Sequence, residues 1–195
     1  MTRTLSRYFP ADHVRAGQPT YFVEKFLNAM HVPYWLAIYT NKLRELNPDK
    51  DPRMLYDFWN ELGSFGTDSD YYLGEKKHTI RMNHHIKDGQ MLQLSVWSGK
   101  PYNSPQIKIW EPVKVGAQSI KVDPPYKSDY EYNGPEKWFP SSFWLINGKE
   151  GQPDGHILSH GVLAANDGLS LPGFQSWFRK SSGPAQIIHF TDLRY

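Results

Sequence analysis

Residues 75–85, EKKHTIRMNHH, bring together two lysines, a threonine, an arginine and three histidines around one isoleucine. Such a set could serve an active site, an edge that contacts nucleic acid, or an ordinary charged strand on a solvent-exposed surface. Thr79 and Arg81 are two positions apart, so on a β-strand their side chains share one face. The planar guanidinium of Arg81 could contact a phosphate or the edge of a base. The spacing therefore favours a binding face on this strand.

A second group of candidate residues follows the next predicted strand. Ser98, Gly99 and Lys100 predict a loop whose backbone could approach an anion, with the lysine to neutralise its charge. The loop lacks the G-x-x-x-x-G-K-[ST] spacing of a P-loop, so nucleotide hydrolysis is not expected. Trp97 could stack on a base, or it could belong to the core, as a tryptophan at the end of an alternating strand often does. We therefore expect a basic cleft with aromatic side chains at its edge.

The sequence excludes several kinds of metal site. It contains no cysteine, which rules out a thiolate zinc site and a disulfide scaffold. His84 and His85 are adjacent and would point to opposite faces of a strand, and no H-E-x-x-H motif accompanies them. We therefore expect neither a metal nor a cofactor.

Length and charge limit the class of protein. The 195 residues are enough for one domain with a core, and 15% of them are aromatic. The 22 basic residues nearly balance the 20 acidic ones, so the net charge is only +2. This balance disfavours a protein that holds long duplexes by bulk electrostatics, and it favours a local basic patch or a small target such as one base.

Neither a signal peptide nor a membrane span is expected. The first ten residues lack the apolar core of a signal peptide. No apolar run approaches the roughly 20 residues that a membrane-spanning helix needs. We therefore expect a soluble, cytoplasmic protein without a membrane segment.

The elements that position the candidate residues change character along the chain. Helical spacing of apolar residues predicts helices at residues 21–31, 34–46 and 52–62, and later at residues 155–165 and 170–179. Ser170 is the expected N-cap of the last helix, and Asn166-Asp167-Gly168 is expected to end the helix before it. Residues 63–74 predict a loop, and residues 123–140 predict a long irregular connection.

Strands are expected mainly between the two helical regions. Apolar and polar residues alternate with a period of two at residues 78–82, 91–97, 105–110, 118–122, 142–146 and 185–191. The pattern predicts an α+β fold in which a small, largely antiparallel sheet curls into a barrel beside helices. We expect residues 1–74 to form a helical N-terminal extension packed on a barrel domain of residues 75–195, as one compact unit.

Short motifs in a fixed order resemble the ASCH family of small domains with a PUA-like β-barrel. These motifs are Lys76-x-x-Thr79-Ile80-Arg81, the turn at Gly89, residues 95–101, Gln106-Ile107 and residues 165–171. The resemblance covers residues 75–195 and is strongest to the larger ASCH-like proteins of Bacteroidetes and their phages. Residues 15–26 are similar to the N-terminal part of those larger proteins. PUA-like barrels commonly bind RNA or a modified base between the sheet and its covering helices, so the resemblance implies such a ligand.

The resemblance also implies a catalytic alternative. One small bacterial ASCH protein is an amidohydrolase for acetylated cytidine, and its lysine, threonine and distant glutamate fall here on Lys76, Thr79 and Asp167. In that chemistry Thr79 supplies the hydroxyl nucleophile, and Lys76 deprotonates it if burial lowers the lysine pKa. Asp167, shorter by one methylene than the family's glutamate, orients the lysine or moves a proton to the leaving amine. Lys76 must precede the strand, because residues three apart on a strand face opposite ways.

Three functions remain open at this point. The first is an RNA-, modified-base- or nucleotide-binding protein that uses Arg81, Trp97, Ser98 and Lys100. The second is an amidohydrolase for an acylated cytidine-type nucleoside. The third is a phage or mobile-element accessory protein that binds a host protein through its N-terminal part or through residues 123–140.

Overall fold

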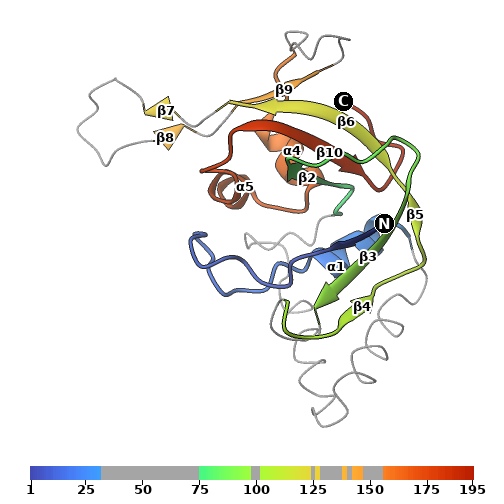
Figure 1. Ribbon diagram of the computed structural model, residues 1–195. Helices are drawn as coiled ribbons and strands as arrows, with labels where there is room; N and C mark the ends of the chain where they lie inside the picture. The colour runs from blue at the N-terminus through green and yellow to red at the C-terminus, as the bar shows by residue number, and fades with distance from the viewer. Residues whose placement is uncertain (32–74, 98–101, 124–125, 128–137, 140–141, 147–155) are drawn as a thin grey trace.

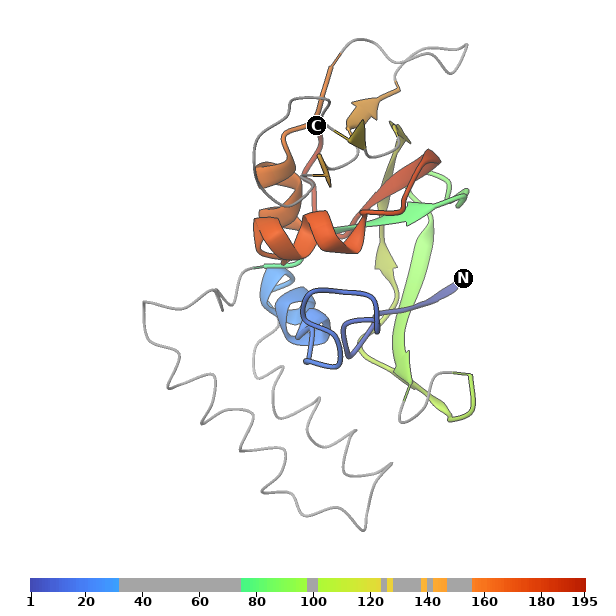
Figure 2. The same ribbon diagram turned by 90° about the vertical axis from the view of Figure 1, so that its left-hand side faces the viewer.

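The structure is a computed structural model that describes residues 1–31, 75–97, 102–123, 126–127, 138–139, 142–146 and 156–195. These residues form an α+β fold with three helices and two four-stranded sheets. Figure 2 shows the helices on one side of the molecule and most of the strands on the other. The predicted fold class and the predominance of antiparallel pairing are therefore confirmed. The described strands form these two sheets and a separate two-stranded ribbon, and they do not close into a barrel.

The first sheet contains β1, β3, β4 and β5. Their bounds are Thr2–Thr4, Met91–Trp97, Gln106–Lys108 and Val113–Lys114. β3 lies between β1 and β4, and β5 pairs with the beginning of β3. β1 runs parallel to β3 and the other pairs are antiparallel. β1 was not predicted, because three residues are too few to show alternation.

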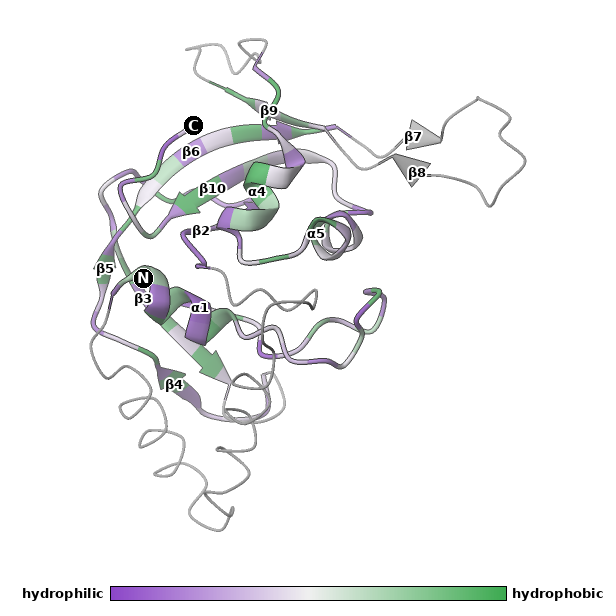
Figure 3. Ribbon diagram, turned by 180° about the vertical axis from the view of Figure 1, so that it is seen from behind, coloured by the Kyte–Doolittle hydropathy of each residue, from purple (hydrophilic) through white to green (hydrophobic). Residues whose placement is uncertain are grey.

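The second sheet has the strand order β2-β10-β6-β9 and is antiparallel throughout. The bounds of these strands are His78–Met82, Gly183–His189, Gly116–Val122 and Phe143–Leu145. Only Val115 separates β5 from β6, so the chain passes directly from the first sheet into the second (Figure 1). Figure 3 shows hydrophilic and hydrophobic residues following one another along β6 and β10, as expected for strands whose two faces differ.

The helices are α1 (Phe22–Ala29), α4 (His160–Asn166) and α5 (Leu171–Trp177). They share the core with the sheets: Phe26 of α1 contacts Phe190 and Phe174 of α5 contacts Phe143, with ring centroids 5.2 and 5.3 Å apart. Ser170 caps α5 as predicted, because its hydroxyl accepts a hydrogen bond from the Gly173 N–H at 3.3 Å. No helix among the described residues is long and apolar enough to cross a membrane.

The structure differs from the prediction in two other places. α4 begins at His160, five positions after the predicted start, because residues 156–158 extend the ladder of β9 instead. The Leu158 N–H donates to the Phe143 carbonyl, and the Leu145 N–H to the His156 carbonyl. Within the predicted irregular connection, β7 (Tyr126–Lys127) and β8 (Trp138–Phe139) pair as a short ribbon.

Part of the prediction lies outside the described residues. This applies to the predicted helices at residues 34–46 and 52–62 and to the loop at residues 63–74. The division between residues 1–74 and 75–195 stays a prediction. The parallel pairing of β1 with β3 joins strands from the two sides of that division.

Candidate functional site

The predicted lysine and aspartate meet, although 91 positions separate them in the chain. The Lys76 ammonium forms a salt bridge with the Asp167 carboxylate and donates a further hydrogen bond, 2.9 Å long, to the Asp167 carbonyl. The ring of Phe22 covers the ammonium, with the centroid 3.9 Å from Nζ. The side chains of the pair are only 1% and 4% exposed. The ammonium is thus fully occupied by contacts within the protein.

The local backbone explains how this pair forms. α4 ends at Asn166, and Gly168 takes a φ of 71°, which turns the chain toward the residues before β2. Lys76 and Asp167 then form a β-bridge, and the Lys77 N–H donates to the Asn166 carbonyl at 2.7 Å. β2 begins at His78, so Lys76 precedes the strand, as the catalytic alternative requires.

Helix α1 contributes a second buried lysine that the sequence analysis did not single out. Lys25 Nζ donates to the Gly168 carbonyl at 2.6 Å, and the Lys25 carbonyl accepts from the Lys76 N–H at 3.0 Å. Burial, together with the charge of Lys76, lowers the pKa of Lys25 to about 8. The sequence did contain a signal for this buried lysine. Lys25 lies close to Phe22 and Phe26 on a helix whose apolar residues are buried.

Burial shifts the pKa values of both members of the Lys76–Asp167 ion pair. Burial lowers the pKa of Lys76, and the Asp167 carboxylate opposes that change. Burial raises the pKa of Asp167, and the charges of Lys76, Arg81 and Lys25 oppose it. One carboxylate therefore faces three cations in this region of the protein.

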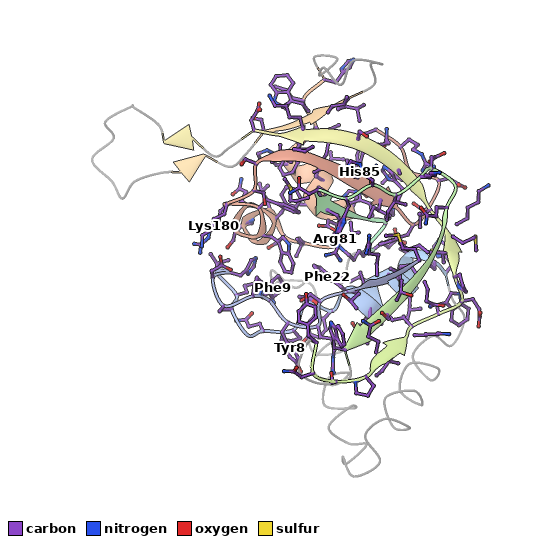
Figure 4. The ribbon with its side chains drawn as sticks, viewed as in Figure 1. Tyr8, Phe9, Phe22, Arg81, His85 and Lys180 are labelled. Atoms are coloured by element: carbon purple, nitrogen blue, oxygen red, sulfur yellow. The ribbon has the colours of Figure 1, made fainter. Side chains whose placement is uncertain are left out.

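Arg81 extends from β2 into the space between the two sheets (Figure 4). Its Nη2 donates to the Thr4 carbonyl of β1 at 2.8 Å. Its Nε is buried and has no hydrogen-bond partner in the described part of the chain. Burial lowers the pKa of Arg81 and the charge of Arg3 lowers it further, while Asp167 raises it. Arg81 is thus a largely desolvated cation whose hydrogen-bonding capacity is only partly used.

Thr79 shares the strand face of Arg81, and its side chain lies beside that of Ile188 across the β2–β10 ladder. It is 8% exposed. Among the described residues, its hydroxyl donates no hydrogen bond to Lys76 or Asp167. The structure therefore brings together two members of the predicted catalytic set, while the third lies on the same strand without a direct bond to them.

Of the other predicted ligand-binding residues, Trp97 is the one within the described part of the chain, and it is the last residue of β3. Trp97 is partly buried, and its ring centroid lies 5.3 Å from that of Tyr102. Tyr102 is 87% exposed. Ser98 and Lys100 lie outside the described residues. The same holds for much of the N-terminal part and for most of residues 123–140, on which the host-protein alternative depends.

A buried histidine pair is another feature that the sequence analysis did not single out. His78 and His189 face each other in the β2–β10 ladder, and both are 0% exposed. Tyr195 Oη lies 3.1 Å from His78 Nδ1 and accepts from Asn166 Nδ2 at 3.0 Å. Burial holds the pKa of His78 well below its usual range and lowers that of His189 to about 4. Both imidazoles are therefore neutral packing groups near neutral pH.

Metal ligands do not cluster in the described part of the chain. No group there combines three or more histidine, cysteine, aspartate or glutamate side chains in a geometry that could hold a metal ion. His84 and His85 belong to no such group.

Comparisons with protein-family models, with curated proteins and with solved structures give no match to this chain. The ASCH resemblance therefore rests on the sequence motifs alone.

Proposed function

We propose that this chain is an ASCH-like protein of PUA-like fold that binds RNA, a modified base or a nucleotide. The observation that carries the proposal is Arg81, a desolvated guanidinium between the sheets with a buried Nε that makes no hydrogen bond among the described residues. Burial of a cation without an anionic partner is costly, so such a group is typical of a site that receives a negatively charged or hydrogen-bond-accepting ligand.

Two further features support the proposal. Thr79 places a hydroxyl on the same strand face as Arg81, and Tyr102 exposes an aromatic ring beside that of Trp97 at the end of β3. Nucleobases stack on exposed aromatic rings while cations contact phosphates or base edges. The direct passage from β5 to β6 joins the two sheets in a way that a strongly curled PUA-like barrel would require.

Direct binding measurements test the proposal. Fluorescently labelled RNA and DNA oligomers and unlabelled nucleosides are titrated at several salt concentrations against the protein and its Arg81→Gln variant. We expect saturable binding by at least one of them and a loss of about 10-fold or more in the variant. Lys114→Gln, which removes an exposed lysine on β5, is the matched control and should bind normally. Absence of saturable binding to every one of these probes would end the proposal.

The Lys76–Asp167 ion pair favours a second candidate, an amidohydrolase for an acylated cytidine-type nucleoside. Burial lowers the pKa of Lys76 and raises that of Asp167. The two pKa values are therefore closer together than in water, and proton transfer from the lysine to the aspartate costs less free energy. Thr79, three residues after Lys76, would supply the hydroxyl. Lys76 has its ammonium engaged by Asp167 and Phe22, so this chemistry requires ligand binding to open the pair.

Acetylcytidine hydrolysis, followed by its change in absorbance, tests this second candidate. Thr79→Val removes the hydroxyl with little change in volume, and Thr79→Ser retains it. If the reaction occurs, we expect Thr79→Val and Lys76→Ala to abolish it and Thr79→Ser to keep a measurable part. An unchanged rate in Thr79→Val would exclude the threonine as the nucleophile.

A further inference from the structure

We propose that Arg3 and Arg81 together bind one phosphate group, so that the ligand is a phosphorylated nucleotide rather than a neutral nucleoside. The proposal rests on the proposed nucleotide-binding function. It adds a residue from β1, outside the part of the chain that carries the ASCH resemblance. It also assigns a chemical class to the ligand.

The position of Arg3 places it on the inner face of the first sheet. Arg3 lies opposite Leu94 in the parallel β1–β3 pair, so the two side chains share a face. Leu94 is 2% exposed, and Leu5, two residues after Arg3 on the same side of the chain, is also 2% exposed. A charged residue therefore occupies a position where its neighbours are core residues.

The Arg3 guanidinium has no partner among the described residues. Its Nε is buried and makes no hydrogen bond there, and its side chain takes part in no ion pair with them. Arg81 shows the same property at its own Nε. Two buried guanidinium nitrogens thus lack acceptors, one from each sheet. Buried polar groups normally have partners, and an orphaned donor indicates a missing acceptor.

The two arginines lie within electrostatic range of each other and of a third basic side chain. The charge of Arg3 lowers the pKa of Arg81. Burial lowers the pKa of His84, which follows β2, and the charges of Arg3 and Arg81 lower it further. Basic groups from β1, from β2 and from the segment after β2 therefore converge on one region.

The carboxylate that acts on Arg81, that of Asp167, does not compensate this charge. Asp167 acts on Arg81 but is committed to the salt bridge with Lys76. Arg81 is largely desolvated and Arg3 is partly buried with a buried Nε, and two like charges placed close together in such surroundings cost free energy unless an anion joins them. A phosphate monoester carries up to two negative charges and three acceptor oxygens, and guanidinium forks match its geometry. A phosphate is therefore the group that best satisfies both arginines at once.

Calorimetric titration with the four ribonucleoside 5′-monophosphates and the four matching nucleosides tests the proposal. We expect at least one monophosphate to bind 10-fold or more tightly than its nucleoside, by roughly the strength of charge-assisted hydrogen bonds. Arg3→Gln should weaken binding of that monophosphate by about 10- to 100-fold and leave nucleoside binding nearly unchanged, and Arg81→Gln should weaken binding of the monophosphate by at least as much. Arg3→Lys keeps the positive charge but lacks the planar guanidinium, so its affinity for the monophosphate should lie between those of wild type and Arg3→Gln. The exposed-lysine control Lys114→Gln should match wild type.

A second pair of probes separates a free nucleotide from the end of an RNA. A four-nucleotide RNA with a 5′-phosphate is compared with the same RNA without it. A preference for the phosphorylated RNA that disappears in Arg3→Gln supports a phosphate at an RNA end. Tight binding of the monophosphates, with no preference between the two RNAs, supports a free mononucleotide. Either result supports the two-arginine site.

Thermal unfolding without ligand distinguishes a ligand-binding arginine from a structural one. Because Arg3 has no partner among the described residues and is close to another cation, Arg3→Gln should be at least as stable as wild type. A marked loss of stability that Arg3→Lys restores would mean a structural role and would overturn the proposal. Equal affinity for monophosphates and nucleosides, with the same affinities in Arg3→Gln, would also overturn the two-arginine phosphate site. The proposed binding of a base would then still stand. Failure of nucleosides, monophosphates and RNA alike to bind would overturn both proposals.

Discussion

At the scale of single residues, the Lys76–Asp167 pair organises the site. Its side chains are almost completely buried, and the ring of Phe22 closes the remaining side of the ammonium. A buried ion pair adds little net stability compared with apolar residues, but removal of one partner leaves an uncompensated charge in the interior. The pair therefore fixes where the start of β2 meets the end of α4, and it makes that junction sensitive to substitution.

Substitution of Lys76 measures how much the fold depends on the pair. Lys76→Met leaves the Asp167 carboxylate buried without its cation, so we expect a loss of about 3–5 kcal/mol in the free energy of unfolding. The control is Lys77→Met at the next position, where the lysine pairs with Glu75 at 2.8 Å and both side chains are about one-third exposed. That change should cost less than about 1 kcal/mol. Urea denaturation compares the two variants, and similar losses in both would contradict a special role for the buried pair.

A pH effect on stability is expected from Glu24, a buried residue in the first turn of α1. Burial raises the pKa of Glu24 from 4.5 to about 7. The native protein then holds a proton that the unfolded chain releases, so the stability contribution is complete below pH 4.5 and is lost as the pH rises through about 7. The loss should be on the order of 3 kcal/mol.

The Glu24→Gln variant isolates this effect. The glutamine cannot ionise, so the variant should be more stable than wild type at pH 8 and should lose less stability between pH 5 and pH 8. Urea midpoints at the two pH values provide the measurement. Glu111→Gln, at an exposed position, is the control and should follow wild type. Parallel pH profiles for wild type and Glu24→Gln would show that Glu24 does not titrate as described.

At the scale of elements, the turn after α4 joins three parts of the chain. Gly168 follows the helix with a φ of 71°, and its carbonyl accepts from Lys25 of α1. A Cβ built on Gly168 would lie 3.0 Å from Lys25 Cδ and 3.4 Å from Lys76 Cβ. Both the backbone conformation and the crowding therefore require glycine at this position.

Two glycine substitutions separate these requirements. Gly17 has a similar φ of 75°, but a Cβ there would meet nothing within 4 Å. Gly17→Ala should cost only the left-handed strain of about 1–2 kcal/mol. Gly168→Ala should cost about 1–3 kcal/mol more, because the methyl group displaces Lys25 or Lys76. Thermal or urea unfolding compares the two, and equal losses would mean that the crowding at Gly168 is relieved without cost.

At the scale of the whole molecule, strands and helices with clear periodicity could be predicted from sequence. The alternation of MLQLSVW predicts β3 with its observed bounds, and residues 78–82 form β2 as expected. The contact of Lys76 with Asp167 could be expected only through the family motif, because no local pattern connects positions so far apart. Arg3 had no signal, because β1 is too short to show alternation and its burial depends on pairing with β3.

The two-sheet arrangement also explains why a nearly neutral chain can carry a cationic site. The net charge of +2 gives no indication of a basic patch. The fold brings Arg3 of β1 near Arg81 of β2, which Lys76 precedes by five residues, and the Asp167 carboxylate acts on Lys76 and Arg81. Tertiary contacts bring these positive charges together in one region, whereas the composition gives only the net charge of the whole chain.

The most direct measurement follows the Nε–H signals of Arg81 and Arg3 by two-dimensional NMR during titration with the ribonucleoside 5′-monophosphates. The arginine-to-glutamine variants assign the two signals. If these nitrogens donate to a bound ligand, both signals should shift and saturate at the same nucleotide concentration as the backbone amides of β2. Saturable binding of a nucleotide with neither Nε–H signal displaced would contradict the placement of the ligand between the two sheets.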